Sequence, residues 1–452
     1  MRTLTVEAEI GELAPGGEGV AICTIDGERR AVFVPGVLTG ERVRAEVDLE
    51  RRPARGRLLA VLEPSASRVT PPCAHVARCG GCDWMSLSPE AQAREHAAIV
   101  GRLLGGAPPR SHHAVRALGY RTRARVHAES KRGRVIVGMF GRRSHEPAAV
   151  DTCVVLDPVL DRARDALAGW LEGATGRGEA ELGLGRPGEP RMAVLELRWS
   201  AELPGAVFGR LERAVKEGAL AGARVFSGGA SAPGRDREPR RGAAARFAGA
   251  PAKIGDPTPF IVGADDAPLR LAPGGFSQAT EAGNLLLARR VAELARELAP
   301  GPCVELYAGA GNLTVLLARD REVVAVEQDH DACEAARENV AARGLSARVV
   351  EADASAYAIP RSARLVVLDP PREGARAVAE ALAARAAKGA AGRAPAVVYV
   401  ACDPPTLARD AKTLTAAGYA VRTVETFEMF PQTSHVETVV VFDPPARPAS
   451  GA

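Results

Sequence analysis

The stretch CVELYAGAGNLTVLLARDREVVAVE, residues 303–327, decides the fold of the C-terminal half of this 452-residue chain. In it a short apolar run, a turn with Gly309 and Gly311, a helical stretch at 313–318 and a second apolar run at 323–327 follow one another. A strand, a glycine-rich turn, a helix and another strand are typical of a Rossmann-like α/β sheet. The two glycines would let the backbone approach a bound ligand closely.

An acidic residue follows each of three predicted strands in this half. Glu327, Asp353 and Asp369 stand at the ends of successive apolar runs. The carboxyl ends of parallel strands meet at the edge where ligands bind, and a carboxylate there can accept both ribose hydroxyls of a nucleoside. The helix after the turn begins at Asn312 and offers no basic residue for a pyrophosphate, which favours adenosylmethionine over a dinucleotide. Simple solvation of strand ends is the alternative, but the recurrence favours a nucleoside pocket.

A cysteine follows the next apolar run. Cys402 lies in YVACDPP, residues 399–405, directly after the run 396–400, which has the pattern of a buried parallel strand. Its thiol is therefore expected at the same edge of the sheet. A thiolate there can add to an electron-poor carbon, such as C6 of a uracil ring. An ionised Asp403 beside it would raise the pKa of the thiol and so disfavour the thiolate, unless its carboxylate points away or pairs with a base.

A glutamate precedes the last apolar run. Glu437 follows the turn-like PQTSH at 431–435 and precedes the strand-like residues 438–442. A lone glutamate near a C-terminus is usually a surface residue, but these flanking segments favour a position at the edge of the sheet.

On these motifs the chain resembles the RNA uracil-C5 methyltransferase family, which makes 5-methyluridine in ribosomal and transfer RNA. The resemblance covers most of the chain and rests on FSQ at 276–278, ELYAGAGN at 305–312, DPPR at 369–372, CDP at 402–404 and FPQTSHVE at 430–437. It implies adenosylmethionine-dependent methylation of uridine C5, with 23S ribosomal RNA as the expected target and transfer RNA as the alternative. It further implies Cys402 as nucleophile and Glu437 as base, and an adenosylmethionine and uridine pocket lined by Gln278, Tyr307, Asn312, Glu327, Asp353 and Asp369.

Four cysteines form a second constellation in the N-terminal half. Cys73, Cys79 and Cys82 lie in CAHVARCGGC, and Cys153 follows much later. Four thiolates suit either an iron-sulfur cluster or a structural zinc, and free structural cysteines are a third reading. Zinc sites more often pair two short Cys-x2-Cys knuckles, whereas only one short pair is present. The family resemblance implies a [4Fe-4S] cluster. Apart from these four and Cys402, three cysteines remain, and we expect them to be small buried apolar residues: Cys23, Cys303 and Cys333.

Positive charge is concentrated in one segment, although the net charge is only +4. Residues 110–145 contain ten Lys or Arg and one acid, Glu129. Arg121, Arg123 and Arg125 alternate with other residues, so they would share one face of a strand and could follow RNA phosphates. An ordinary solvated face is the alternative. Aromatic residues are only 4% of the chain, which disfavours extensive base stacking.

Composition and patterning suggest three domains. Short predicted strands within residues 1–62 indicate an OB-like barrel, which the resemblance identifies as an RNA-binding TRAM domain. Residues 63–265 are expected to form a central α+β domain that carries the cysteines and a mobile loop at 227–253, and residues 266–452 the Rossmann-like class I methyltransferase domain. No apolar run reaches membrane-spanning length, and the cysteines suit a reducing compartment. The expected protein is therefore a cytoplasmic monomer that binds RNA and no membrane.

Two other classes of function compete with this interpretation. One is a catalytically idle RNA-binding protein, against which the presence of both Cys402 and Glu437 argues. The other is a methyltransferase that acts on a small molecule or a protein, which the barrel and the basic segment disfavour.

Overall fold

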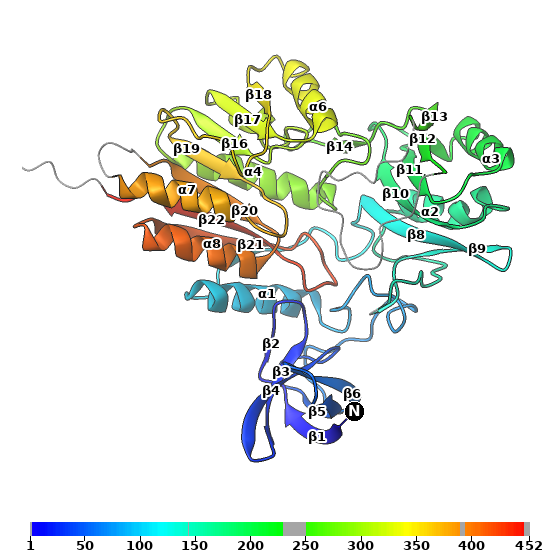
Figure 1. The fold of residues 1–452 in the computed structure, drawn as a ribbon, viewed down its shortest axis with the longest axis vertical. Helices are drawn as coiled ribbons and strands as arrows, with labels where there is room; N and C mark the ends of the chain where they lie inside the picture. The colour runs from blue at the N-terminus through cyan, green and yellow to red at the C-terminus, as the bar shows by residue number, and fades with distance from the viewer. Residues whose placement is uncertain (1, 143, 229–249, 389–393, 447–452) are drawn as a thin grey trace, which may run out of the picture.

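The computed structural model describes residues 2–142, 144–228, 250–388 and 394–446 (Figure 1). The predicted loop at 227–253 lies mostly outside these residues, but its last two residues are part of a strand, Ala252–Gly255. Figure 1 shows the N-terminal strands as a small unit at one end of the molecule, with a layered α/β unit and a second, smaller α/β unit side by side above it. No helix in the described part of the chain is long and apolar enough to cross a bilayer.

The N-terminal β-domain, residues 2–63, is a six-stranded sheet whose order is β1-β5-β6-β4-β3-β2. Along its strands apolar side chains alternate with exposed polar ones, and the apolar set forms one core that includes Ile25, Val32 and Val47. The sequence predicts strands near residues 4–10, 20–25, 31–34, 42–47 and 58–62; each is present, and the structure adds the short β2. The bounds are β1 Thr3–Glu9, β2 Glu12–Leu13, β3 Gly19–Ile25, β4 Glu28–Val34, β5 Arg42–Asp48 and β6 Ala54–Glu63.

The central sheet has the order β13-β12-β11-β10-β8-β9. Its apolar face packs against two helices around buried residues such as Leu182 and Trp199. The opposite face carries charged side chains. The elements are β8 Arg123–Lys131, β9 Arg134–Gly138, α2 Pro158–Trp170, β10 Arg177–Leu184, β11 Ala193–Trp199, α3 Gly205–Lys216, β12 Leu220–Phe226 and β13 Ala252–Gly255.

The C-terminal sheet has eight strands in the order β18-β17-β16-β19-β20-β22-β21-β7, which confirms the Rossmann-like prediction. Strands β16, β17, β18, β19 and β20 are parallel to one another, and β22 is antiparallel to β20. The strands are β16 Cys303–Leu306, β17 Val323–Glu327, β18 Arg348–Glu351, β19 Leu365–Leu368, β20 Ala396–Ala401, β21 Ala420–Phe427 and β22 Glu437–Asp443. The helices are α4 Glu281–Glu297, α5 Thr314–Leu317, α6 His330–Ala341, α7 Arg376–Ala387 and α8 Pro404–Ala416.

Two elements assigned from the sequence to the central domain belong to this C-terminal unit instead. Strand β7, Arg110–His112, pairs in parallel with β21 at the edge of the sheet. Helix α1, Pro89–Leu104, lies beside α8 in Figure 1 and contacts it. A strand of three residues has too few positions to show a period of two, so the sequence pattern could not reveal it. Helix α1 and strand β7 therefore pack with the C-terminal sheet, although they precede the predicted boundary at 265/266.

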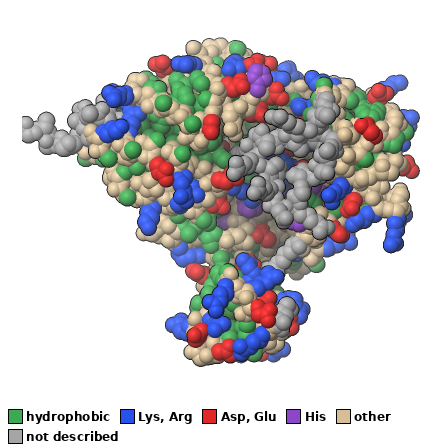
Figure 2. Space-filling model, viewed as in Figure 1, with side chains coloured by type: hydrophobic (Ala, Val, Ile, Leu, Met, Phe, Trp, Pro, Cys, Tyr) green, Lys and Arg blue, Asp and Glu red, His purple; other side chains and the backbone are tan. Residues whose placement is uncertain are grey.

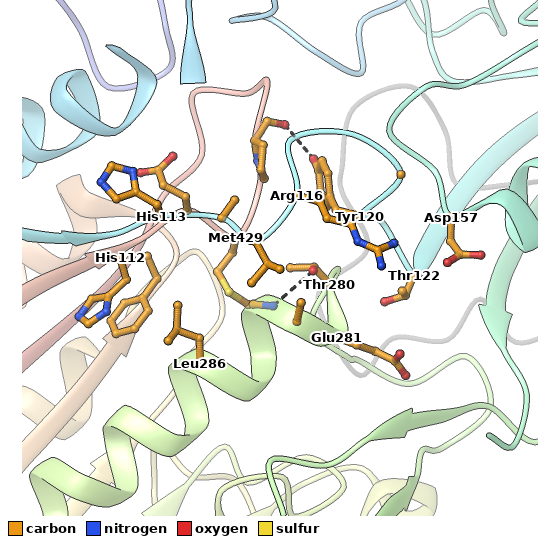
Figure 3. Close-up of a pocket in the computed structure, with 18 residues that line it drawn as sticks. His112, His113, Arg116, Tyr120, Thr122, Asp157, Thr280, Glu281, Leu286 and Met429 are labelled. Carbon is orange, nitrogen blue, oxygen red and sulfur yellow. Dashed lines mark hydrogen bonds between the residues drawn. The ribbon is translucent and has the colours of Figure 1, made fainter. Parts of the chain in front are cut away.

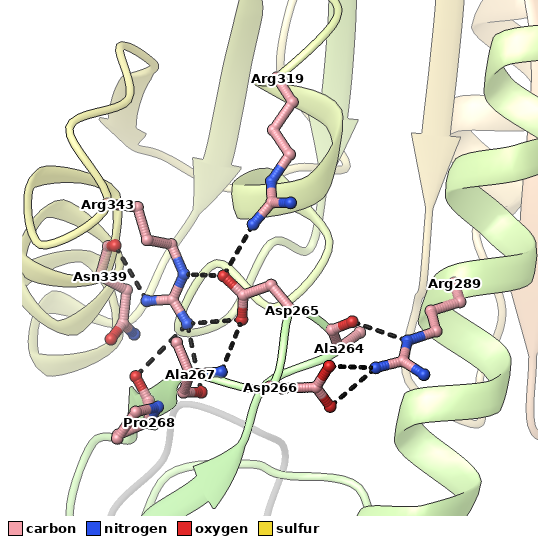
Figure 4. Close-up of polar contacts among 9 residues, drawn as sticks. All are labelled: Ala264, Asp265, Asp266, Ala267, Pro268, Arg289, Arg319, Asn339 and Arg343. Atoms are coloured by element: carbon pink, nitrogen blue, oxygen red, sulfur yellow. Dashed lines mark hydrogen bonds and ion pairs between the residues drawn. The ribbon is translucent and has the colours of Figure 1, made fainter.

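A buried carboxylate fixes the hairpin of β14, Phe260–Val262, and β15, Pro268–Arg270, to this unit (Figure 4). Asp265 in the turn accepts hydrogen bonds from Arg343 Nε at 2.6 Å and Nη2 at 2.9 Å, and pairs with Arg319 at 2.9 Å. The Asp265 and Arg343 side chains are only 4% and 7% exposed. Burial alone would raise the pKa of Asp265, but the hydrogen bonds and charge of Arg343 hold that pKa below its usual value.

We expect Asp265→Ala to lower the free energy of unfolding by about 3–5 kcal/mol, because it leaves the buried Arg343 without its partner. The matched control is Asp266→Asn in the same turn: asparagine tolerates the left-handed backbone of this residue, at φ +63°, and the exposed pair with Arg289 is expected to contribute about 0–1 kcal/mol. Because the folded pKa of Asp265 is depressed, its contribution is present above the unfolded pKa and is lost as pH falls through the folded pKa. Urea unfolding at pH 7 and below pH 4 should thus show a difference between wild type and Asp265→Ala that shrinks in acid.

Candidate active site

The glycine-rich turn after β16 gives its two glycines different neighbours. Gly309 and Gly311 both have positive φ, +55° and +83°. A Cβ built on Gly309 would meet nothing within 4 Å, whereas one on Gly311 would lie 3.3 Å from Ala336 of α6. Gly309 therefore faces open space in which a ligand could approach the backbone, and Gly311 makes room for a helix. The sequence predicted that both glycines face the ligand, and the space around Gly309 alone agrees with that prediction.

Tyr307 begins this turn and is held in the left-handed region at φ +63°. A non-glycine residue in this region carries backbone strain, which is common at functional sites. Burial, together with the charges of Asp353 and Asp410, raises the pKa of the Tyr307 hydroxyl to about 12. The hydroxyl therefore remains a neutral hydrogen-bond donor at pH 7.

The acids at the strand ends differ in how they are engaged. Glu327 accepts hydrogen bonds from the backbone N–H of Gly309 at 2.9 Å and from those of Gln328 and Asp329 at 2.8 and 2.9 Å. It thereby ties the turn to the start of α6. Asp353 lies two residues beyond β18, is exposed, and accepts from the N–H of Ser355 at 2.8 Å.

Gln278 brings a buried amide to the same edge. Its Nε2 donates to Asp369 Oδ2 at 3.3 Å, and the residue is 7% exposed. Its Oε1 is buried and has no hydrogen-bond partner among the described residues. A buried acceptor without a donor costs about 1–3 kcal/mol, so this atom marks a position where a bound ligand could donate.

Asn312 is committed to the scaffold. Its Nδ2 donates to Asn284 Oδ1 at 2.8 Å, and Asn284 Nδ2 donates back to Asn312 Oδ1 at 3.0 Å. This reciprocal pair joins the end of the turn to α4. Part of the role of Asn312 is therefore to hold the two elements together.

Glu305 is a buried acid that the sequence did not single out as a candidate site residue. It lies within β16 beneath the turn, is 2% exposed, and accepts a hydrogen bond from Thr314 Oγ1 at 2.6 Å. Burial, with a smaller effect of the Asp369 charge, raises its pKa to about 8. It is therefore mostly protonated at pH 7 and adds little negative charge under the pocket. The sequence feature that could have indicated it is an acidic residue within the short, fully buried strand β16.

The sheet brings Cys402 and Glu437 to neighbouring strand ends. In the antiparallel ladder of β20 and β22, Val400 pairs with Val439 and Ala401 with Thr438. Cys402 directly follows β20, and Glu437 is the first residue of β22, so both stand next to the last pair of this ladder. Cys402 is half-buried and Glu437 is 2% exposed. The fold thus brings two residues 35 positions apart in the sequence to neighbouring strand ends.

The Asp403 carboxylate is engaged by the helix that follows Cys402. Asp403 is the N-cap of α8, and its Oδ1 accepts from the N–H of Thr406 at 2.9 Å. This hydrogen bond offsets part of the negative charge of the carboxylate. Asp403 then disfavours a thiolate at Cys402 less than a free carboxylate would. The positive end of the α8 dipole also favours negative charge near its first residues.

The four N-terminal cysteines converge on one cavity. Cys73, Cys79, Cys82 and Cys153 line it together with Met85 and Arg121, among other residues. Burial, with the neighbouring Cys153 and Cys79, raises the pKa of Cys82 to about 12. Within the described residues, however, no three or more His, Cys, Asp or Glu side chains have an arrangement that could hold a metal ion. The cysteines predicted to be plain core residues are buried; they are Cys23, Cys303 and Cys333.

Acids from another strand compensate the predicted arginine row. Strand β8 begins at Arg123, and Arg121 lies before it, with its Nε donating to the carbonyl of Arg123 at 3.0 Å. Arg123 binds Glu181 of β10 at 2.7 Å, and Arg125 lies 3.7 Å from the same carboxylate. Although residues 110–145 contain only one acid, acidic side chains from other parts of the chain lie close to these arginines in the folded structure. Glu181, more than 50 residues away in the chain, faces Arg123 and Arg125 across the sheet.

A separate pocket of about 260 Å³ adjoins the segment that leads to Glu437 (Figure 3). Phe427, Met429 and Pro431 line one side of it, and residues 112–122 and the start of α4 line the others. The Tyr120 hydroxyl donates to the carbonyl of Pro431 at 2.8 Å, the bond drawn in Figure 3. Neither Cys402 nor Glu437 is among the described residues that line it.

Known proteins resemble this chain over its full length. Residues 267–393 match the family model described as methyltransferase small domain. A Halomonas elongata protein named 23S rRNA (uracil(1939)-C(5))-methyltransferase RlmD is 35% identical over 99% of this chain and 91% of its own length. A protein of the same name from Alkalilimnicola ehrlichii is 32% identical over 98% of this chain and 97% of its own.

A solved structure supports the fold. The Pyrococcus abyssi tRNA (uracil-54, C5)-methyltransferase in complex with S-adenosyl-L-homocysteine covers 97% of this chain and 100% of its own, with a TM-score of 0.72. Its sequence is 20% identical, so this likeness concerns the fold alone.

Proposed function

This chain belongs to the RNA uracil-C5 methyltransferase family, and from that premise we propose that it methylates C5 of a uridine in 23S ribosomal RNA. The full-length similarity to enzymes named for that reaction supports ribosomal RNA as the substrate. Transfer RNA is the second candidate, as the family resemblance implies, and the solved structure of similar fold is that of an enzyme named for transfer RNA.

The observation that carries the mechanism is that Cys402 directly follows β20 and Glu437 begins the neighbouring strand β22, on either side of the last pair of their ladder, Ala401 and Thr438. Uracil C5 is a poor nucleophile. A bond from the Cys402 sulfur to C6 moves the C5=C6 electron pair toward C5, which can then attack an electrophilic methyl group. Glu437 then accepts the C5 proton, the C–H electrons re-form C5=C6, and the C6–S pair returns to sulfur. A general base of this kind typically contributes 10²- to 10⁴-fold.

The residues at the strand ends suit S-adenosylmethionine as methyl donor. When bound, it would supply a methyl group on a sulfonium centre. Gly309 would allow close backbone approach, and the unpartnered Gln278 Oε1 would accept from the ligand. Glu327 and Asp353 would bind the ribose, since a carboxylate has lone pairs beyond those its present hydrogen bonds use. Tyr307, Asn312 and Asp369 complete the proposed pocket.

The direct test is methyl transfer to 23S ribosomal RNA from a strain that lacks the gene. Purified protein and methyl donor should add 5-methyluridine, measured by mass spectrometry of the digested nucleosides, and transfer RNA from the same strain is the comparison substrate. Methyl groups that appear only on another nucleoside, or only on protein, would reject the proposal.

We propose that the arginines near β8 contact phosphates in part. Arg123 is held by Glu181, while Arg125 is about half exposed. The triple Ala variant of Arg121, Arg123 and Arg125 should lower the salt slope of RNA binding by about one per lost phosphate contact, with methyl-donor affinity unchanged. Arg213→Ala, on the helix that covers the other face, is the control. An unaltered slope in the triple variant would make this strand a solvated face.

The N-terminal β-domain is proposed as an RNA-binding TRAM domain. On the face in Figure 2 its basic side chains are interspersed with acidic ones. Several charged side chains of this domain are paired with each other, including Arg44 with Glu7 and Arg57 with Glu46. Its contacts with RNA would therefore come from a few sites rather than from a continuous basic surface.

We also propose a [4Fe-4S] cluster on the four converging cysteines. Their shared cavity supports convergence, and four thiolates match the ligand number of a cubane cluster. Anaerobically purified protein should be brown with about four irons per chain. Cys79→Ser should lose both colour and iron, whereas Cys333→Ser, which replaces a buried cysteine in α6, should keep them. One zinc and no iron would refute the cluster.

A further inference from the structure

The loop that leads into Glu437 is held mainly by distant parts of the chain. We call residues 430–436 the base loop. Its internal hydrogen bonds are few, such as Thr433 Oγ1 to the carbonyl of Phe430 at 2.7 Å. Gln432 in the middle is in the left-handed region at φ +73°, which is strained for a side chain of this kind. Contacts from outside must therefore stabilise this conformation.

Asp83 supplies two of these contacts. Its Oδ1 accepts from the backbone N–H of Ser434 at 2.9 Å, and its Oδ2 accepts from the Ser434 hydroxyl at 2.6 Å. Ser434 is three residues before Glu437. Two hydrogen bonds to an ionised carboxylate are among the stronger polar contacts that a protein makes. They fix both the backbone and the side chain of the base loop at one point.

The neighbours of Asp83 hold the strained residue. The N–H of Trp84 donates to the carbonyl of Gln432 at 3.0 Å. Gln92 of α1 accepts from the N–H of Gln432 at 2.7 Å and donates from Nε2 to its Oε1 at 3.3 Å. The left-handed conformation of Gln432 is thus specified by residues some 340 positions earlier in the chain.

The N-terminal β-domain is seated against the same point. Gly17, at φ +85°, has its carbonyl bound by Trp84 Nε1 at 3.2 Å. A Cβ on Gly17 would lie 2.6 Å from Asp83 Oδ2, 2.7 Å from Trp84 Nε1 and 2.8 Å from Ser434 Cβ. Such distances leave no room for a side chain. The turn of the β-domain therefore closes directly over the bond between Asp83 and Ser434.

We propose that Asp83 is a positioning residue for Glu437, and that Gly17 of the N-terminal β-domain keeps the Asp83–Ser434 contact in place. The β-domain then has a part in catalysis that is independent of any RNA it binds. This inference rests on the proposed role of Glu437 as the base that removes the C5 proton. It predicts that loss of the contact slows this proton removal, while formation of the Cys402 adduct and methyl transfer continue.

The test follows the covalent protein–RNA adduct on denaturing gels together with steady-state turnover. Asp83→Ala should lower turnover about 10- to 100-fold, the range that a misplacement of about 1 Å can cause, and the fraction of enzyme held as adduct should rise. Asp83→Asn can still accept from the Ser434 N–H and can donate to its hydroxyl, so it should restore most of the turnover. Ser434→Ala removes the hydroxyl bond to Oδ2 but keeps the backbone N–H bond to Oδ1, so it should raise the adduct fraction in the same direction as Asp83→Ala and to a smaller extent.

Two glycines provide a matched pair for the β-domain. Gly17→Ala should accumulate adduct as Asp83→Ala does. Gly16→Ala has the same kind of backbone strain, at φ +96°, but its Cβ would meet nothing within 4 Å, so its adduct level should stay at that of wild type. Equal adduct levels in the two alanine variants would overturn the part assigned to the β-domain.

The remaining outcomes separate this inference from the proposed function. If Glu437→Gln accumulates adduct and neither Asp83→Ala nor Ser434→Ala does, Asp83 is not a positioning residue. If Glu437→Gln itself forms no adduct, the base assignment fails and this inference fails with it. Melting temperatures and iron content of each variant identify a general loss of structure, which would lower adduct and turnover together and would also count against the inference.

Discussion

Cys402→Ala is expected to abolish methylation, by about 10⁴-fold or more, which is the scale of loss when a covalent enzyme is deprived of its nucleophile. The thiol is proposed to attack the uracil and not the methyl donor, so donor affinity measured by calorimetry should be nearly unchanged. Turnover is best followed by transfer of a labelled methyl group to ribosomal RNA.

RNA that contains 5-fluorouridine gives this prediction a second readout. Fluorine at C5 cannot be removed as a proton, so wild type should form a stable adduct and Cys402→Ala should form none. Cys333→Ala, which alters a buried cysteine of α6, is the control for general effects of thiol loss. A Cys402→Ala protein that still turned over would refute the nucleophile assignment.

Glu437→Gln is expected to lower turnover by about 10²- to 10⁴-fold and to leave the enzyme covalently joined to methylated RNA. The amide is close in shape to the carboxylate but cannot accept the C5 proton, so the thiolate is not expelled. The adduct should require the methyl donor and should be visible on denaturing gels. Glu351→Gln, an exposed glutamate at the end of β18, is the control. Absence of adduct in Glu437→Gln would move the base to another residue.

Local patterns in the sequence predicted much of the C-terminal sheet. The strand 323–327 matches β17, and the predicted run before Cys402 matches β20 to within one residue. These strands are buried, so their apolar runs are unbroken and bounded by turns. The same signal fixed the side of the sheet on which Cys402 emerges.

Contacts between distant segments were beyond this kind of reasoning. Glu181 neutralises Arg123 from across the sheet, and Asp83 reaches Ser434 over more than 350 positions. In neither pair does the sequence around one residue indicate which distant residue it contacts. Spacing likewise indicated that Cys73 and its partners converge, but the arrangement of sulfur atoms around a metal depends on loops whose shape no periodicity encodes.

The pairing of β7 with β21 has a consequence for synthesis on the ribosome. The paired residues are 315 positions apart, so β7 and the apolar face of α1 emerge long before the strand they join. At about 5–20 residues per second, this interval is roughly 15–60 s. During that time the nascent chain carries an uncovered edge segment, which chaperones or the early-folding β-domain would have to shield. Slow codons placed between these segments would lengthen that exposure and should lower the yield of soluble protein.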